Sequence, residues 1–186
     1  MLIALAVAWA YSITLDGYFT HDATSYLSST VTADRDRLHF EGRYNYESLH
    51  TGSLWAGYNF STGKKLVLHL TPMAGAIFGS TSGFAPGLEA SLTYKRLALS
   101  ISNEFVFSTT GKSESFYYSW NELTYAAADW LRVGGVVQHT KAFHGSFDVQ
   151  PGFLVSASHK DMEFTTYVFS ASLKNPTVIL EAGINF

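Results

Sequence analysis

Apolar and polar side chains alternate along most of this chain with a period of two residues. The last segment, 177–186, is the clearest case, because one set of alternate positions reads Val, Leu, Ala, Ile, Phe and the other reads Thr, Ile, Glu, Gly, Asn. The same split recurs over 37–47 and over 96–107, where Asn103 is the one misfit on the oily side. Successive side chains of a β-strand point to opposite faces of a sheet, so the pattern predicts strands with one oily face and one polar face.

Turn-forming residues divide the chain into segments of similar length. Tight connections such as 34–36 and 62–64 alternate with longer ones such as 78–84 and 108–114. This alternation predicts about twelve antiparallel strands and no helix, with short turns on one rim and longer loops on the other. The expected strands are 11–19, 26–33, 37–47, 52–61, 65–77, 85–94, 96–107, 115–126, 130–140, 147–158, 162–172 and 177–186.

The length and composition of these segments favour a membrane barrel over a soluble barrel or sandwich. The chain is 47% hydrophobic and 15% charged, yet beyond residues 1–10 no stretch approaches the roughly 18 apolar residues that a membrane-spanning helix needs. Strands of about nine to twelve residues suit a tilted bilayer crossing, whereas soluble strands average about five or six. Aromatic residues on the oily face gather toward strand ends, where interfacial girdles lie. We place there Tyr44, Tyr46, Tyr58, Phe60, Tyr94, Phe107, Tyr117 and Tyr125.

The final strand carries a resemblance to a known class. Its alternating apolar residues end in Phe186, and this pattern resembles the terminal strand of bacterial outer-membrane β-barrel proteins. The resemblance covers essentially the whole chain after residue 10 in pattern and names no subfamily. It implies an all-β, transmembrane, antiparallel up-and-down barrel, integral to the outer membrane of a Gram-negative bacterium, with both termini on the periplasmic side. It also implies that Phe186 is an assembly signal read by the barrel assembly machinery, and that the partners include outer-membrane lipid and lipopolysaccharide.

The first ten residues differ from the rest because they are apolar throughout. They are too short to span a bilayer, and they end in Ala8-Trp9-Ala10, a small-x-small pattern like that before a signal-peptidase cut. We interpret residues 1–10 as the remnant of a secretory signal and residues 11–186 as a single barrel domain. The alternative is that these residues begin the first strand.

Charged residues fall with some consistency on the face opposite the oily one, which would line a lumen. Acids from different strands outnumber bases there, so the predicted wall is acidic. Rings of carboxylates lower the barrier to positive charge, and Glu104 and Glu122 near mid-barrel are expected to contribute most. The alternative is a hydrogen-bonded network that holds the barrel shut. The predicted lumen residues are Asp16, His39, Glu41, Arg43, His69, Glu89, Glu104, Glu122, Arg132, Glu163 and Glu181.

The sizes of the other inward side chains point in two directions. Trp55, Tyr118, Trp120 and Tyr167 are large and would fill a lumen. Many others are small, which we interpret as favouring an open passage. The small inward residues are Gly57, Gly75, Gly87, Ser91, Ser100, Ser102, Gly134, Gly152, Ser156 and Gly183.

A lipid-directed enzyme is the alternative function, because some outer-membrane barrels are hydrolases. The run Ser119-Trp120-Asn121 resembles a hairpin of outer-membrane phospholipase A, but Phe107 and Thr109 stand where that family keeps its His and Ser. A hydroxyl without an imidazole to take its proton is not activated. A second pattern, His144-Gly145-Ser146 near Asp148, is a weak signal on a predicted loop. We therefore assign no catalytic residue.

Other classes of ligand find little support. The chain has no Cys, and His39 and His69 lack a fixed ligand spacing, so no metal and no cofactor are assigned. A net charge of −3 leaves no basic footprint for nucleic acid. The predicted function is a narrow pore for small solutes with an acidic, cation-preferring lumen; an outer-membrane lipid hydrolase or deacylase is the alternative, and a purely structural barrel is the third.

Overall fold

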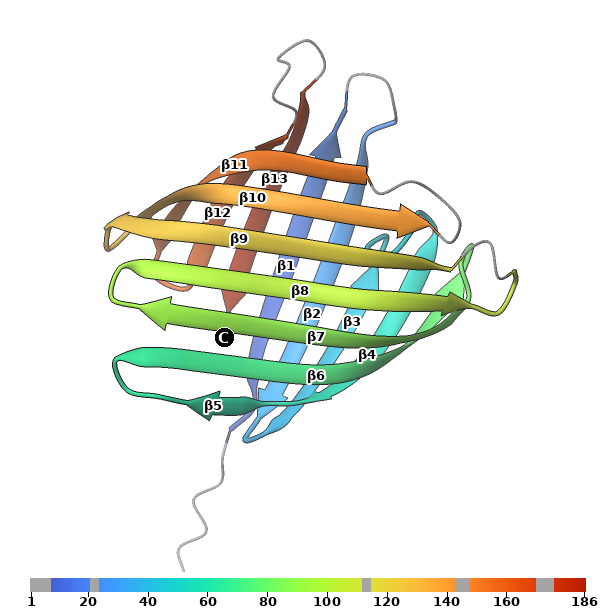
Figure 1. Cartoon of the computed structure of the whole chain (residues 1–186), viewed down its shortest axis with the longest axis horizontal. Coiled ribbons are helices and arrows are strands. Elements are labelled where there is room, and N and C mark those ends of the chain that lie inside the picture. Colours follow the sequence, from blue (N-terminus) through green and yellow to red (C-terminus); the bar gives the residue numbers. More distant parts are fainter. Residues whose placement is uncertain (1–7, 21–23, 112–114, 143–147, 170–175) are drawn as a thin grey trace, which may run out of the picture.

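The strands form one closed antiparallel barrel (Figure 1). The computed structural model describes residues 8–20, 24–111, 115–142, 148–169 and 176–186. Strand β1 (Ala10–Phe19) pairs with β13 (Thr177–Asn185), which joins the two ends of the sheet. The other strands are β2 (Tyr26–Arg35), β3 (Leu38–Tyr44), β4 (Thr51–Tyr58), β5 (Phe60–Thr62), β6 (Leu66–Gly79), β7 (Gly83–Tyr94), β8 (Leu97–Ser108), β9 (Phe116–Ala128), β10 (Leu131–Ala142), β11 (Asp148–His159) and β12 (Met162–Phe169).

Strands β4 and β5 together occupy one strand position of the barrel, and Asn59 separates them. Both pair with β6, and the register is continuous, since Gly57 lies opposite Met73 and Phe60 lies opposite Leu70. That register places Pro72 opposite Tyr58, the last residue of β4 beside the interruption, and proline has no N–H to donate to the ladder. The barrel therefore has twelve strand positions, as the alternation predicts, with one short extra strand. The part of the predicted strand 162–172 beyond Phe169 lies outside the described residues.

The predicted strand 37–47 ends early, at Tyr44, because the backbone reverses at Asn45. Asn45 has a φ of 57°, a left-handed conformation that asparagine tolerates better than most residues. Its amide donates to the Leu27 carbonyl at 2.9 Å, and its Oδ1 accepts from the His50 N–H at 2.7 Å. We call residues 45–50 the inner loop. Tyr46 was expected on the oily face, and that prediction is wrong, because the reversal turns it into the barrel.

The outer surface of the barrel is apolar and exposed, while most charged side chains of the strands lie inside. Asn103, the polar misfit of β8, accepts a hydrogen bond from the Tyr117 hydroxyl at 2.7 Å. No helix among the described residues is long and apolar enough to cross a membrane. The exposed apolar side chains include Leu15, Leu27, Val31, Leu54, Leu123, Val133, Phe153, Phe164 and Leu180 along the strands, and Tyr44, Tyr58, Phe60, Tyr94, Phe107 and Tyr125 nearer their ends.

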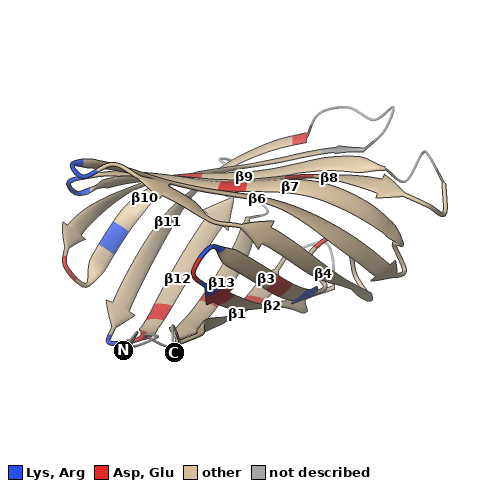
Figure 2. Cartoon of the chain, turned by 90° about the horizontal axis from the view of Figure 1, so that it is seen from below, with Lys and Arg blue, Asp and Glu red and all other residues tan. Residues whose placement is uncertain are grey.

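The two rims of the barrel differ, and we call them the turn rim and the loop rim. Short turns at the turn rim need left-handed residues at their tips, and Asp36, Lys95 and Lys160 have φ of 55°, 54° and 55°. The start of β1 meets the end of the chain at this rim, where the Phe186 N–H donates to the Tyr11 carbonyl at 2.9 Å. Figure 2 shows Lys and Arg, in blue, at several of these turns. The inner loop and the β6–β7 connection lie at the loop rim.

The assignment of faces predicts where a new charge is tolerated. Leu180 is 48% exposed on the outer face near the middle of β13, whereas Ser100 lines an interior cavity. Leu180→Arg should lower the free energy of unfolding by about 2–4 kcal/mol, the cost of a lipid-facing cation at mid-depth, and Ser100→Arg should lower it much less. Urea titration of the protein folded in lipid vesicles, followed by Trp fluorescence, measures both. A greater loss for Ser100→Arg would mean that the two faces are reversed.

Candidate functional site: the lumen

Arg43 on β3 is the centre of an ion-pair cluster that crosses the barrel. Its Nε donates to Glu41 Oε2 at 2.5 Å, and its Nη1 donates to Glu104 Oε2 at 3.0 Å. Its Nη2 lies 3.6 Å from Glu89 Oε1. Glu104 is on β8 and Glu89 is on β7, and neither strand neighbours β3 in the sheet. These contacts therefore span the interior and tie opposite walls together.

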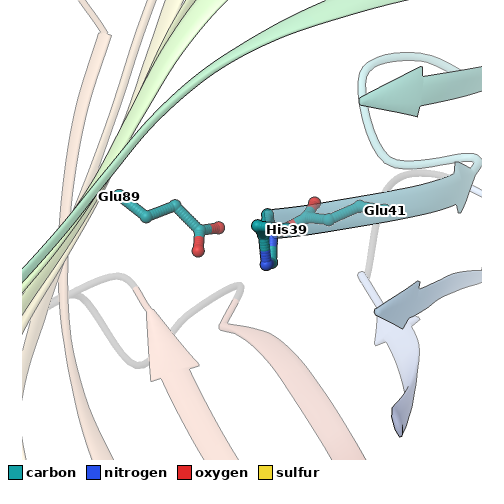
Figure 3. Close-up of side chains that lie close together, drawn as sticks. All are labelled: His39, Glu41 and Glu89. Carbon is teal, nitrogen blue, oxygen red and sulfur yellow. The ribbon is translucent and has the colours of Figure 1, made fainter. Parts of the chain in front are cut away.

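His39 extends this cluster toward the turn rim. Its Nδ1 lies 2.8 Å from Asp34 Oδ1, and its Nε2 lies 2.7 Å from Glu41 Oε1. The carboxylate of Glu89 reaches from the opposite wall toward His39 and Glu41 (Figure 3). A continuous chain of polar contacts thus runs from Asp34 through His39 and Glu41 to Arg43.

The inner loop adds two side chains that the list of lumen residues omits. Tyr46 packs under the guanidinium of Arg43, with 4.5 Å from Cζ to the ring centroid. Glu47 accepts from Ser53 Oγ at 2.6 Å and from Trp55 Nε1 at 3.1 Å. Asp34 was also omitted, because its position in a predicted turn hid it. Alternation placed Glu47 on the polar face, and this was the one signal that could have found it.

A second acidic group comes from the neighbouring strands β1 and β13 and from β9, which lies further round the barrel. Asp16 and Glu181 are direct neighbours in the register of β1 and β13. Glu181 accepts from the Tyr167 hydroxyl at 3.3 Å, and Glu122 accepts from Trp120 Nε1 at 2.7 Å. Asp16, Glu122 and Glu181 line one cavity together with Glu89, so the two acidic groups face each other.

The remaining predicted residues lie apart from these groups. Arg132 pairs with Glu163 near the turn rim, and both side chains are partly exposed. His69 lines the cavities on the turn side of the lumen and is not part of the His39 cluster. Phe186 extends the pairing of β13 with β1 by its backbone and leaves its ring exposed on the turn rim.

The interior contains a series of cavities that share lining residues. At the turn rim, a cavity of about 720 Å³ is bordered by Asp34 and His69. His69 also borders the next cavity, of about 320 Å³, which extends to Glu89. Glu89 in turn borders a cavity of about 190 Å³ and another of about 380 Å³. The smallest of the four lies among tyrosines, which we call the tyrosine constriction: Tyr18, Tyr46, Tyr118 and Tyr167.

Two apolar clusters pack in the loop-side half of the interior. One is built around Trp55 with Met73, Ile77, Ala85 and Val106. The other contains Val136, Leu154, Tyr167, Phe169 and Ile179. The lumen is therefore wider and more polar toward the turn rim and narrower toward the loop rim.

These clusters correct the interpretation of the small inward residues. A Cβ at Gly75 would lie 2.5 Å from the indole of Trp55, and one at Gly152 would lie 2.9 Å from the ring of Phe169. Aromatic rings pack against these two glycines, so the glycines leave no open space beside them. For Gly75 and Gly152 the expectation of an open passage is wrong, because residue size was considered without the side chain across from it. Ser91, Ser100 and Ser102, in contrast, line the cavity of about 320 Å³. Gly183 is also different, since the nearest atom to its Cβ position is 3.9 Å away.

The residues considered for catalysis do not form a hydrolytic centre in the described part of the chain. The amide of Asn121 donates to Ser119 Oγ at 2.7 Å, and Ser119 is 4% exposed. Phe107 stacks on Phe84, and Thr109 donates to the Ser82 carbonyl. His144, Gly145 and Ser146 lie outside the described residues.

The fold is that of bacterial outer-membrane porins. The KdgM porin has a TM-score of 0.65 and 13% identity, with 94% of this chain and 99% of that chain covered. The NanC porin has a TM-score of 0.61 and 7% identity, covering 92% and 98%. Omp33 of Acinetobacter baumannii has a TM-score of 0.56 and 11% identity, covering 96% and 98%.

A second KdgM structure, in complex with disordered oligogalacturonate, has a TM-score of 0.64. No family model and no curated protein matches the chain. At these identities, the likeness establishes the fold alone.

The burial of Arg43 predicts a large difference between the two lumen arginines. Arg43→Gln would leave Glu41 and Glu104 without their buried cation, and should lower the free energy of unfolding by about 3–5 kcal/mol. The matched change Arg132→Gln removes a partly exposed pair and should cost about 0–1 kcal/mol. Urea titration in lipid vesicles compares the two variants. Equal losses would show that the cross-barrel cluster does not stabilise the fold.

Proposed function

We propose that this protein is an integral outer-membrane pore that passes small solutes and prefers cations. The observation that carries the proposal is the series of cavities that share Glu89 and His69 and run from the turn rim to the tyrosine constriction. The likeness in fold to outer-membrane porins supports it. The exposed apolar belt fits contact with outer-membrane lipid and lipopolysaccharide, and the terminal Phe186 fits recognition by the assembly machinery.

The preference for cations rests on the balance of charge inside the barrel. Arg43 and Arg132 are set against a larger number of inward carboxylates. A confined, low-dielectric lumen screens such an excess less than bulk solvent does, so a cation inside should be favoured over an anion. Such a wall would repel the oligogalacturonate that the KdgM porin binds. The inward carboxylates are Asp16, Asp34, Glu41, Glu47, Glu89, Glu104, Glu122, Glu163 and Glu181.

The tyrosine constriction would set the size limit of the passage. Tyr46 reaches from the inner loop to Tyr118 on β9, with ring centroids 5.9 Å apart in an edge-to-face arrangement. Ions and solutes would have to pass beside this pair, where Asp16, Glu89 and Glu181 also face the cavity. The proposed substrates are therefore small, and they carry positive charge or none.

Glu89 is the carboxylate we expect to govern selectivity. Its side chain is 38% exposed and borders three of the cavities, whereas Glu104 is buried against Arg43. Glu89→Gln should move the reversal potential under a salt gradient toward zero in planar bilayers, because it removes a solvent-facing charge from the lumen. The matched change Asp161→Asn, in a turn at the rim, should move it less. A folded barrel that passes no current would contradict the pore, and anion preference would contradict the acidic wall.

Tyr46 tests the constriction independently of charge. Tyr46→Ala should raise the single-channel conductance, because it removes a ring from the narrowest cavity while leaving the wall strands intact. Tyr44→Ala changes an outward tyrosine of β3 and should leave conductance unchanged. Planar-bilayer recording of both variants makes the comparison. No increase for Tyr46→Ala would place the narrowest point elsewhere.

A further inference from the structure

We propose that the lumen contains a binding site for a divalent transition-metal ion, formed by His39, Glu41 and Glu89. Each of these side chains offers one ligand atom, and the three atoms lie within 4.8 Å of one another. His39 and Glu41 come from β3, and Glu89 comes from the opposite wall (Figure 3). Imidazole nitrogen and carboxylate oxygen together are a usual ligand set for zinc and its neighbours.

Asp34 positions His39 for this role. Its Oδ1 lies 2.8 Å from Nδ1, so the carboxylate can accept the Nδ1 proton and turn Nε2 toward Glu41 and Glu89. Histidine ligands of metal ions are commonly oriented in this way by a carboxylate on the other ring nitrogen. Nε2 now lies 2.7 Å from Glu41 Oε1, and the single proton between them is the one that a metal ion would replace.

Arg43 positions the second ligand. It holds Glu41 through Oε2 at 2.5 Å, which leaves Oε1 directed at His39. The third ligand, Glu89, is partly exposed and its carboxylate can move. Ligand atoms around a tetrahedral zinc ion lie about 3.3 Å apart when the bonds are about 2.0–2.1 Å long. Closure of the site therefore needs a shift of the Glu89 side chain and a widening of the Nε2 to Oε1 distance from 2.7 Å to about 3.3 Å.

The site opens onto space that can hold an ion and its water. His39, Glu41 and Glu89 all line the cavity of about 380 Å³. Water from this cavity can fill the remaining coordination positions, as in zinc sites with fewer than four protein ligands. An ion would therefore be held from both walls of the lumen.

The local charge also favours a cation. Asp34, Glu41, Glu89, Glu47 and Glu104 surround Arg43 and His39, so carboxylates exceed basic groups. Glu47 Oε2 and Glu104 Oε1 are buried without a hydrogen-bond partner among the described residues. A divalent ion would offset part of this excess. An imidazole ligand selects zinc or cobalt over calcium and magnesium, which prefer oxygen ligands alone.

The test measures Zn²⁺ binding to the full chain folded in detergent micelles, by competition with a chromophoric chelator. The parent protein should bind one equivalent. His39→Gln and Glu89→Gln should each weaken binding at least tenfold, and His69→Gln, a lumen histidine outside the site, should not. Co²⁺ should give visible absorption bands that disappear in His39→Gln. Ca²⁺ in equal amount should not displace Zn²⁺.

Several outcomes would overturn the site. These are the absence of stoichiometric binding, an equal loss in His69→Gln, or displacement of Zn²⁺ by Ca²⁺. Heat-modifiable migration in gel electrophoresis identifies the variants that fold. If His39→Gln fails to fold, Glu89→Gln still tests the site, because it changes a partly exposed side chain. Binding in micelles needs no current, so the site and the pore can fail separately.

Discussion

Closure of the sheet is the constraint on which the rest of this structure depends. The pairings of β1 with β13 and of β4 with β6 close the sheet, so every strand but the short β5, which pairs with β6 alone, finds hydrogen-bonding partners on both sides, as a lipid environment requires. Closure also fixes an inside and an outside. Because side chains alternate, one face of every strand must then be compatible with the outer surroundings and the other with a confined interior. The exposed Leu180 and the buried Arg43 are both results of that division.

The interior that closure creates is too small for its charges to be independent. Arg43 contacts carboxylates on β3, β7 and β8, and its removal from water is offset only because those partners converge on it. His39 and Asp34 extend the same network. The residues that brace the wall, Glu41 and Glu89, are therefore the same ones that line the interior cavities.

The sequence predicts the strands and their faces well because alternation is local. The alternation of apolar and polar residues in 177–186 can be read from the sequence without knowing which strands lie beside it. Two kinds of information are not local. Tyr46 turns inward because Asn45 reverses the backbone and binds Leu27 on another strand. Gly75 looks like empty space until Trp55 is placed beside it. Likewise, the meeting of Glu89 with His39 and Glu41 requires the register and diameter of the whole barrel. Cross-lumen partners were therefore outside the reach of pattern analysis.

The tyrosine constriction of this barrel is formed partly by the inner loop and not by the wall strands alone. Tyr46 lines the tyrosine constriction and Glu47 lies beside Ser53 and Trp55. Both belong to a short connection in which Asn45 binds the Leu27 carbonyl and the His50 N–H. Exchange of residues between Asn45 and His50 would alter bore and local charge without disturbing a strand register. On the proposed pore function, exchange of this single segment would give barrels with different solute ranges on one scaffold.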